Sequence, residues 1–227
     1  MIPVLIALTL AAAQSEKLLI ASIDPAKVDN GAVAELVWDG DELVVLVAVP
    51  RGSAHEARFF ALAGPGVALR QLPAPPASRD EYWKRKASRL SPTGLGRIEK
   101  SSDAKMPMMG VGSLERRLEG AAEMGGMDQT FELRLNSRVL HSRKGRDIYD
   151  GEVWAWSPAE QNQIAYVDGK GDLWIARADG EQARRLLKGN FLLPAWSLDG
   201  RAIAVVERNA RKKRWDVYVV PVRASKR

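Results

Sequence analysis

A Trp-Ser pair occurs twice in this 227-residue chain, and each copy is followed by the same series of short apolar segments. Trp156-Ser157 and Trp196-Ser197 lie 40 positions apart. The matching segments downstream are Gln163–Val167 with Ala202–Val206, and Asp172–Ala176 with Asp216–Val220. Self-similarity near this period indicates a repeat architecture, in which each unit buries its apolar face against the next unit.

The matched segments have the composition of β-strands. They are rich in Val, Ile, Trp and Tyr, which favour a pleated, half-buried surface. Asp-Gly turns punctuate them, and glycine accepts the positive φ of a tight hairpin without a Cβ clash. The first copy therefore predicts four strands, at Val153–Ser157, Gln163–Val167, Asp172–Ala176 and Ala183–Leu187. Four antiparallel strands in ~40 residues are typical of a β-propeller blade, and the tryptophans are expected to fill the space between blades.

The residues of both copies resemble the TolB-type propeller repeat, a WD-repeat-like family whose repeat reads Trp-Ser-Pro-Asp-Gly, Ile-Ala-Phe, Asp-Ile-Tyr, Asp-Gly and Leu-Thr. The motif residues are Trp156, Ser157, Pro158, Trp174, Asp179 and Gly180 in the first copy, and Trp196, Ser197, Asp199, Gly200 and Tyr218 in the second. The first copy departs from the pattern at Ala159-Glu160, and the second at Leu198. The resemblance covers about a third of the chain and implies a propeller that binds partners in the cell envelope through one face of the ring and its central opening. It carries over no binding residue.

The repeat predicts an all-β, β-propeller-like array of four-stranded antiparallel blades, small (about four to five blades) or incomplete. The clear blades span 153–190 and 192–222, and a third blade is predicted at 35–72. Leu18–Ser22 is expected to pair beside Val217–Val222, because closure by the two chain ends would remove exposed strand edges. A half-propeller completed by another chain is the alternative.

The middle of the chain fits the blade pattern less well. Leu90–Gly94 resembles a degenerate blade opening, and Asp80–Leu90 is expected to form a strand or a short helix. Phe131–Leu135 alternates like a half-buried strand. Ser137–Tyr149 predicts a hairpin around Lys144-Gly145, and residues 101–127, rich in Gly and Met, predict an irregular insert.

Residues 1–13 have the layout of a secretory signal peptide. The apolar run Pro3–Leu10 is followed by three alanines that a signal peptidase accepts, although no Lys or Arg precedes the run. Cleavage after Ala13 would leave a domain at 14–227, in the periplasm or outside the cell. The run is shorter than the ~20 residues of a membrane span, so we expect no transmembrane span in the mature chain. A buried first strand is the alternative.

The composition excludes several kinds of site. The chain has no cysteine, which excludes disulfides, thiolate zinc sites and a cysteine nucleophile. It has two histidines, His55 and His141, so a multi-histidine metal site would need a second chain. The formal net charge of +6 favours attraction to anionic surfaces.

A basic run between two predicted strands is the candidate anion site. Its residues are Arg208, Arg211, Lys212, Lys213 and Arg214. Such a run can hold phosphates or anionic lipid headgroups, or it can be a solvated hairpin tip. Specific nucleic-acid binding would also need aromatic or base-reading groups, and Trp215 alone is close.

Other candidate chemistry has a simpler structural explanation. Ser113 follows a Gly-Val-Gly sequence but lacks the glycine that follows the serine of a nucleophile elbow. Five methionines could bind Cu(I) through their thioethers or pack as a soft apolar segment; they are Met106, Met108, Met109, Met124 and Met127. Three aspartate pairs could bind calcium but are expected to cap their own turns; they are Asp39/Asp41, Asp147/Asp150 and Asp168/Asp172.

The sequence thus predicts an exported, non-catalytic propeller that acts as a protein- or ligand-binding platform, needs no cofactor and has another envelope protein as its partner. Two alternatives remain open. One is a hydrolase or lyase that uses the propeller face, and the other is a binder of anionic polymers or lipids.

Overall fold

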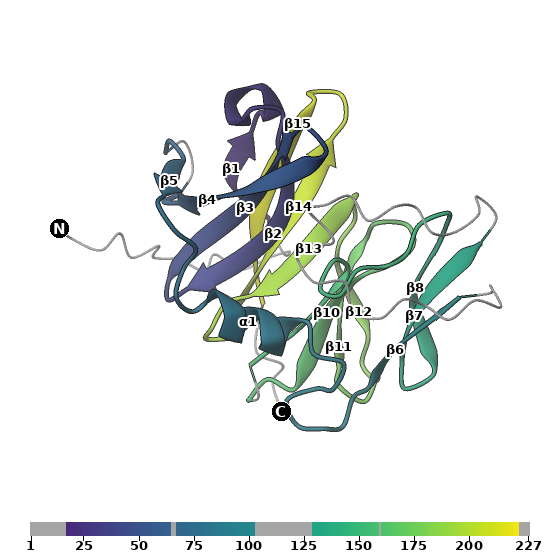
Figure 1. The fold of residues 1–227 in the computed structure, drawn as a ribbon. Helices are drawn as coiled ribbons and strands as arrows, with labels where there is room; N and C mark the ends of the chain where they lie inside the picture. The colour runs from purple at the N-terminus through teal and green to yellow at the C-terminus, as the bar shows by residue number, and fades with distance from the viewer. Residues whose placement is uncertain (1–16, 65–66, 103–128, 159, 223–227) are drawn as a thin grey trace.

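The fold consists of four antiparallel sheets, in a computed structural model that describes residues 17–64, 67–102, 129–158 and 160–222 (Figure 1). The predicted signal peptide, most of the insert at 101–127, Ser113 and the five methionines lie outside the described residues. We number the sheets I to IV in chain order. The predicted class of short antiparallel units is confirmed at this level: the described residues are mostly β, with one α-helix and one short 3-10 helix in addition.

Sheet III corresponds to the first clear repeat copy. Its strands are β9 (Trp154–Trp156), β10 (Gln163–Val167), β11 (Leu173–Arg177) and β12 (Arg184–Leu187). Each strand pairs with the next along the chain, so the order is β12-β11-β10-β9. The strands predicted from the pattern of Val, Ile and Trp are confirmed to within about two residues.

Sheet IV joins the two ends of the chain. It contains β13 (Phe191–Trp196), β14 (Ala202–Asn209), β15 (Arg214–Pro221) and, at its edge, β1 (Leu18–Ile23). β1 pairs antiparallel with β15, with Leu18 opposite Val219 and Ile23 opposite Trp215. The predicted pairing of Leu18–Ser22 beside Val217–Val222 is therefore confirmed. The short 3-10 helix η1 (Pro25–Val28) leads from β1 toward sheet I.

Sheet I corresponds to the predicted third copy at 35–72. It contains β2 (Ala32–Asp39), β3 (Glu42–Arg51), β4 (Ala54–Leu62) and β5 (Arg70–Leu72), in that order. Gly40 and Gly52, with φ of 60° and 62°, provide its first two turns. β3 is buried along most of its length because core clusters cover both faces of its apolar run.

Sheet II departs most from the pattern. It contains β6 (Ile98–Ser102), β7 (Thr130–Leu135) and β8 (Arg138–Lys144), and helix α1 (Arg79–Lys86) precedes it. The helical alternative for Asp80–Leu90 is thus confirmed. The hairpin predicted around Lys144-Gly145 is wrong: β8 pairs with β7 across Asn136-Ser137, whose φ angles of 46° and 72° form the turn. This pairing buries the alternating apolar residues of β7 in the core.

The sheets pack in the order I, IV, III, II. β13 of sheet IV packs against β2 on one side and against β9 and β10 on the other, and β10 packs against β8. One core cluster spans sheets II, III and IV, and a second spans sheets I and IV. Sheets I and II lie on opposite sides of the molecule in Figure 1, and α1 touches β2 and β9.

No helix in the part of the chain that the structure describes is long and apolar enough to cross a membrane.

Candidate binding pocket at β6

Three sheets open with the same serine turn. In sheet III, Ser157 N donates to Gln163 O at 2.9 Å, and Gln163 N donates to Ser157 Oγ at 2.9 Å. In sheet IV, the same two bonds join Ser197 and Ala202, at 2.9 and 3.0 Å. Because the side chain satisfies a backbone N–H that the turn would leave unpaired, serine is favoured at this position.

The third copy of this turn lies before β6. Ser91 N donates to Gly96 O at 2.8 Å, and Gly96 N donates to Ser91 Oγ at 2.9 Å. Ser91 is buried, as Ser157 and Ser197 are. The degenerate opening that the sequence predicts at Leu90–Gly94 is therefore a repeat opening in its backbone bonding.

Tryptophans at or near the ends of the first strands link the sheets in series. Trp38 Nε1 of sheet I donates to Ala195 O of sheet IV at 3.0 Å. Trp196 Nε1 of sheet IV donates to Ala155 O of sheet III at 3.1 Å. In each of these two bonds the acceptor is the residue before the next tryptophan. An indole N–H that bonds across a buried junction fixes the register of two sheets as well as filling space.

The third link in the series reaches sheet II. Trp156 Nε1 of sheet III donates to Ser88 O, close to the sheet II opening, at 2.6 Å. A methyl group at Gly96 would lie 2.7 Å from the Trp156 ring, so glycine is needed for this approach. The residue before Ser91 is Leu90, which is 53% exposed. The leucine side chain has no hydrogen-bond donor, so the series of side-chain links ends at sheet II.

Helix α1 explains why sheet II lacks a full first strand. Tyr82 Oη donates to Trp196 O at 2.7 Å, and this burial raises the pKa of the Tyr82 hydroxyl. Arg79 forms a 3.0 Å ion pair with the buried Glu35 of β2. The chain is helical as far as Lys86. In the described residues, the first-strand side of sheet II is therefore paired at the isolated bridge between Leu90 and Arg97, where Ile98 N donates to Arg89 O at 2.7 Å.

β6 is consequently an edge strand, and in the described part of the chain its outer backbone groups beyond Ile98 are open. Asn136 N donates to Arg97 O at 3.0 Å, and β6 pairs with β7 in register from Ile98 with Leu135 onward. Antiparallel pairing alternates, so Glu99 and Ser101 bond toward β7 while Lys100 and Ser102 point their N–H and C=O groups to the other edge. The Lys100 side chain is only 3% exposed although the residue as a whole is half-buried. The exposed part of Lys100 is therefore its backbone.

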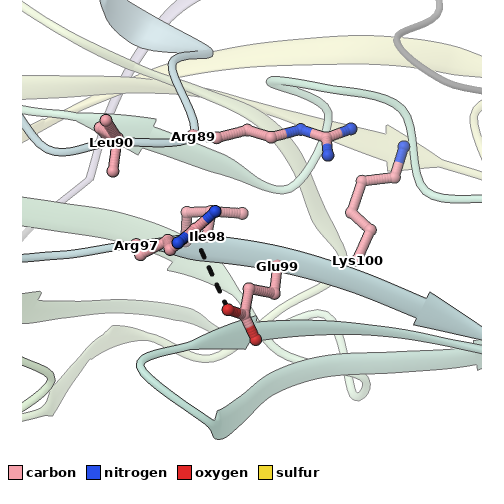
Figure 2. A pocket seen from close by; sticks show the side chains of 6 residues that line it. All are labelled: Arg89, Leu90, Arg97, Ile98, Glu99 and Lys100. Carbon is pink, nitrogen blue, oxygen red and sulfur yellow. Dashed lines mark ion pairs between the residues drawn. The ribbon is translucent and has the colours of Figure 1, made fainter.

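A cavity of about 600 Å³ lies along this edge, and Figure 2 shows the side chains that line it. We call it the β6 pocket, and its lining residues are Arg89, Leu90, Arg97, Ile98, Glu99 and Lys100. The guanidinium of Arg89 extends toward the ammonium of Lys100 (Figure 2). Arg97 faces Glu99 at 3.9 Å. Three cations and one carboxylate give the lining an excess of positive charge.

Carboxylates behind the pocket compensate Lys100 but not Arg89. Lys100 Nζ lies 3.4 Å from Asp150 Oδ1 and 3.7 Å from Asp147 Oδ2. Among the described residues, no carboxylate forms an ion pair with Arg89, whose side chain is exposed. Arg89 is therefore the cation of the pocket that is free to bind an anionic group.

A buried ion pair holds the segment that carries Asp147 and Asp150. Both terminal NH2 groups of the Arg143 guanidinium donate to the Glu152 carboxylate at 2.8 Å, and Nη2 of Arg146 lies 3.2 Å from Glu152 Oε1. Burial would raise the pKa of Glu152, but the hydrogen bonds and charge of Arg143, with Arg146, hold that pKa below its usual value. The carboxylate is thus ionised at neutral pH and fixes the turn between β8 and β9.

The predicted motif residues have packing and turn roles. Trp174 stacks on Tyr166 at 6.3 Å and donates to Asp168 at 3.0 Å. Asp179 and Asp199 accept backbone N–H groups within their turns, and Gly180 and Gly200 have φ of 88° and 69°. Pro158 is buried beside Ser157.

Tyr218 of the same motif set lies with the chain end. It packs edge-on against Phe191, and Lys17 Nζ lies 4.0 Å from the centre of its ring. Lys17 also pairs with Glu207 at 2.9 Å. These contacts hold the start of β1 against sheet IV.

The basic run forms the β14–β15 hairpin tip, at the top of Figure 1 and away from β6. Arg208 lies over the Trp215 ring at 5.7 Å, and Arg214 approaches Asp216 at 2.8 Å. Arg211, Lys212 and Lys213 are exposed. The structure does not bring this run together with the β6 pocket.

The two histidines lie in different sheets. His55 is on β4 and His141 on β8. His141 Nδ1 lies 2.9 Å from Val167 O in sheet III, and burial lowers the pKa of its imidazole. The His141 side chain thus forms a contact between sheets II and III.

The expected capping of their own turns is seen for Asp168, whereas Asp39, Asp147, Asp150 and Asp172 also contact residues more distant in the chain. Asp168 Oδ1 accepts from Lys170 N and Asp172 N, and Asp172 accepts from Gly189 N and Arg185. Asp39 accepts from Ser78. Within the residues described, no three His, Cys, Asp or Glu side chains are grouped as metal ligands.

Sequence reasoning missed Arg89, Arg97 and Lys100 as a group. They are scattered over a segment with no steady pattern, and only the fold aligns them on one edge. The signal that could have located them is the Ser-Pro-x-Gly opening at 91–94 with Leu90 in the tryptophan position.

A scan against protein-family models finds no family that matches this chain, and a search of curated proteins finds no similar sequence.

Proposed function

We propose that this protein is an exported, non-catalytic binding platform of the cell envelope, built as a small TolB-like propeller whose blades are sheets I to IV, and that it binds its partner at the β6 pocket. The observation that carries the proposal is the series of tryptophan links. The indoles of Trp38, Trp196 and Trp156 each donate across a junction to the next sheet, whereas the tryptophan position at the opening of sheet II holds the exposed Leu90. A position that is packed in the other repeat units is open here.

The character of the pocket supports binding. Its lining combines an exposed apolar side chain, an open strand edge and a cation with no carboxylate partner in the described residues, and these are features by which surfaces hold other proteins. The turn aspartates and the motif tryptophans are occupied by structural bonds. The β6 pocket, in contrast, combines exposed side chains with the open edge of a strand.

Site-specific photocrosslinking in living cells tests the proposal. A photoreactive amino acid at Leu90 is expected to yield a crosslinked envelope protein. The matched control is Leu198, a leucine at another repeat opening, which is 40% exposed and follows Trp196-Ser197. Crosslinks at both positions, or at neither, would contradict binding at the β6 pocket.

Export is tested separately. Mass spectrometry of the protein from the periplasmic or culture fraction is expected to find a mature N-terminus at Gln14. An unprocessed chain retained in the cytoplasm would contradict the envelope assignment.

A further inference from the structure

We infer that the β6 pocket binds an extended acidic peptide segment of a partner, which adds to β6 as a further strand. This inference rests on the proposed function and names the partner's chemistry.

The backbone geometry of β6 provides the first argument. An edge strand whose N–H and C=O groups face outward is a template for strand addition. On β6 the open groups belong to Lys100 and Ser102, because the alternation of antiparallel bonds turns Glu99 and Ser101 toward β7. The burial of the Lys100 side chain, with its ammonium on Asp150, leaves the backbone as the part of this residue that a ligand can reach.

The position of α1 provides the second argument. In sheets I, III and IV a first strand of three to eight residues pairs along the second strand. In sheet II that pairing stops at the bridge between Leu90 and Arg97, since the preceding residues belong to α1 and its C-terminal end. An extended peptide beside Lys100 would take the place that the missing part of the first strand has in the other sheets.

Charge decides which peptide fits. Arg89 and Arg97 flank the open edge, and Arg97 has only a distant contact of 3.9 Å with Glu99. Arg89 extends toward Lys100 in Figure 2. A carboxylate on the added strand would lie between cations, so we expect an acidic peptide to bind and a basic one to be repelled.

The experiment measures the fluorescence anisotropy of a labelled ten-residue peptide of alternating Val and Glu with the full-length mature protein. The same peptide with Lys in place of Glu, and the Val-Glu peptide with alternate backbone nitrogens methylated, are the comparison probes. We expect the acidic peptide to bind and both comparison probes to bind at least about tenfold more weakly, because one reverses the charge and the other removes the backbone donors.

Two variants locate the site. Arg89→Glu with Arg97→Glu is expected to weaken binding at least about tenfold through charge reversal. Ser102→Pro removes an outward N–H that β7 does not use, so it is expected to weaken binding without breaking the β6–β7 pairing. The matched charge control is Arg211→Glu with Lys212→Glu on the β14–β15 hairpin tip. If the control and the Arg89/Arg97 variant lose peptide affinity equally, the peptide binds by nonspecific charge attraction and strand addition is overturned.

Amide hydrogen exchange distinguishes strand addition from binding by charge attraction alone, because only an added strand would bond to the backbone amides of β6. Binding is expected to protect the amides of Lys100 and Ser102 and to leave that of Ser101, already bonded toward β7, unchanged. Binding without this protection would overturn strand addition. Peptide binding that occurs only after residues 103–129 are replaced by a short Asn-Gly turn would assign the edge to the chain's own segment instead of a partner.

The two proposals fail in different ways. Leu90 crosslinks with no peptide binding would overturn the acidic-strand inference and keep the binding platform. If the protein with the photoreactive amino acid at Leu90 yields no crosslinked partner, the proposed binding platform itself would be overturned.

Discussion

The junction between sheets IV and III and the opening of sheet II use the same serine turn but differ in the residue before it. Trp196 is 1% exposed and its indole donates to Ala155 O of the next sheet, whereas Leu90 is 53% exposed and its side chain has no donor. The serine turn therefore sets the backbone at the opening of sheets II, III and IV, and the tryptophan sets how a sheet joins its neighbour. A repeat unit that keeps the serine turn and lacks the tryptophan retains its local fold and gains an open surface.

The largest expected difference between these two positions is in stability. Trp196→Ala would leave a cavity at the junction of sheets IV and III and is expected to lower the free energy of unfolding by about 3–5 kcal/mol. Leu90→Ala is expected to change it by less than about 0.5 kcal/mol, since exposed positions are tolerant. Chemical denaturation of both variants measures this, and similar losses would contradict the contrast between a packed and an open junction.

The serine turns are expected to be equivalent in spite of this contrast. Ser157→Ala and Ser91→Ala each leave a backbone N–H without its acceptor, at Gln163 and Gly96 respectively. Each is expected to cost about 1–3 kcal/mol. Denaturation curves provide the measurement, and a cost confined to Ser157 would show that the turn before β6 does not stabilise its sheet.

His141 tests the contact between sheets II and III through pH. Burial lowers its pKa below the usual 6.5, so below pH 6.5 the unfolded chain binds protons more readily than the folded chain. The stability is fully present above pH 6.5 and is lost progressively as the pH falls through the folded-state pKa. As the pH falls from 7.5 to 5.5, the denaturation midpoint should decrease more steeply in the wild type than in His141→Asn. Parallel pH profiles of the two proteins would exclude a contribution of His141 to the pH dependence of stability.

The smallest effect is expected at Arg89. Because it has no carboxylate partner among the described residues and is exposed, Arg89→Glu is expected to change stability by less than about 0.5 kcal/mol. Arg143→Gln is the comparison, since it would leave the buried Glu152 without its main partner and is expected to cost about 3–5 kcal/mol. Thermal melts of the two variants measure this difference, and a large loss for Arg89→Glu would mean that it holds the fold and is not free for a ligand.

Most of the sheets could be predicted from the sequence. The Trp-Ser repeat, the alternation of apolar residues and the Asp-Gly turns located sheets I, III and IV and the closing strand β1, because strand propensity and turn chemistry act over a few neighbouring residues. The hairpin around Lys144-Gly145 failed because Asn136-Ser137 supplied a competing turn and β7 a better apolar partner.

The sequence by itself determined the repeat units, their serine turns and the joining of the chain ends in one sheet. The tertiary structure alone decided which carbonyl each indole meets, such as Trp38 with Ala195, 157 positions away. It also decided between the strand and the short helix that the sequence offered for Asp80–Leu90, and the helix α1 leaves the edge of β6 open between Arg89 and Lys100. These features depend on groups that are distant in the chain and meet only after the sheets have packed, so no local pattern of residues encodes them.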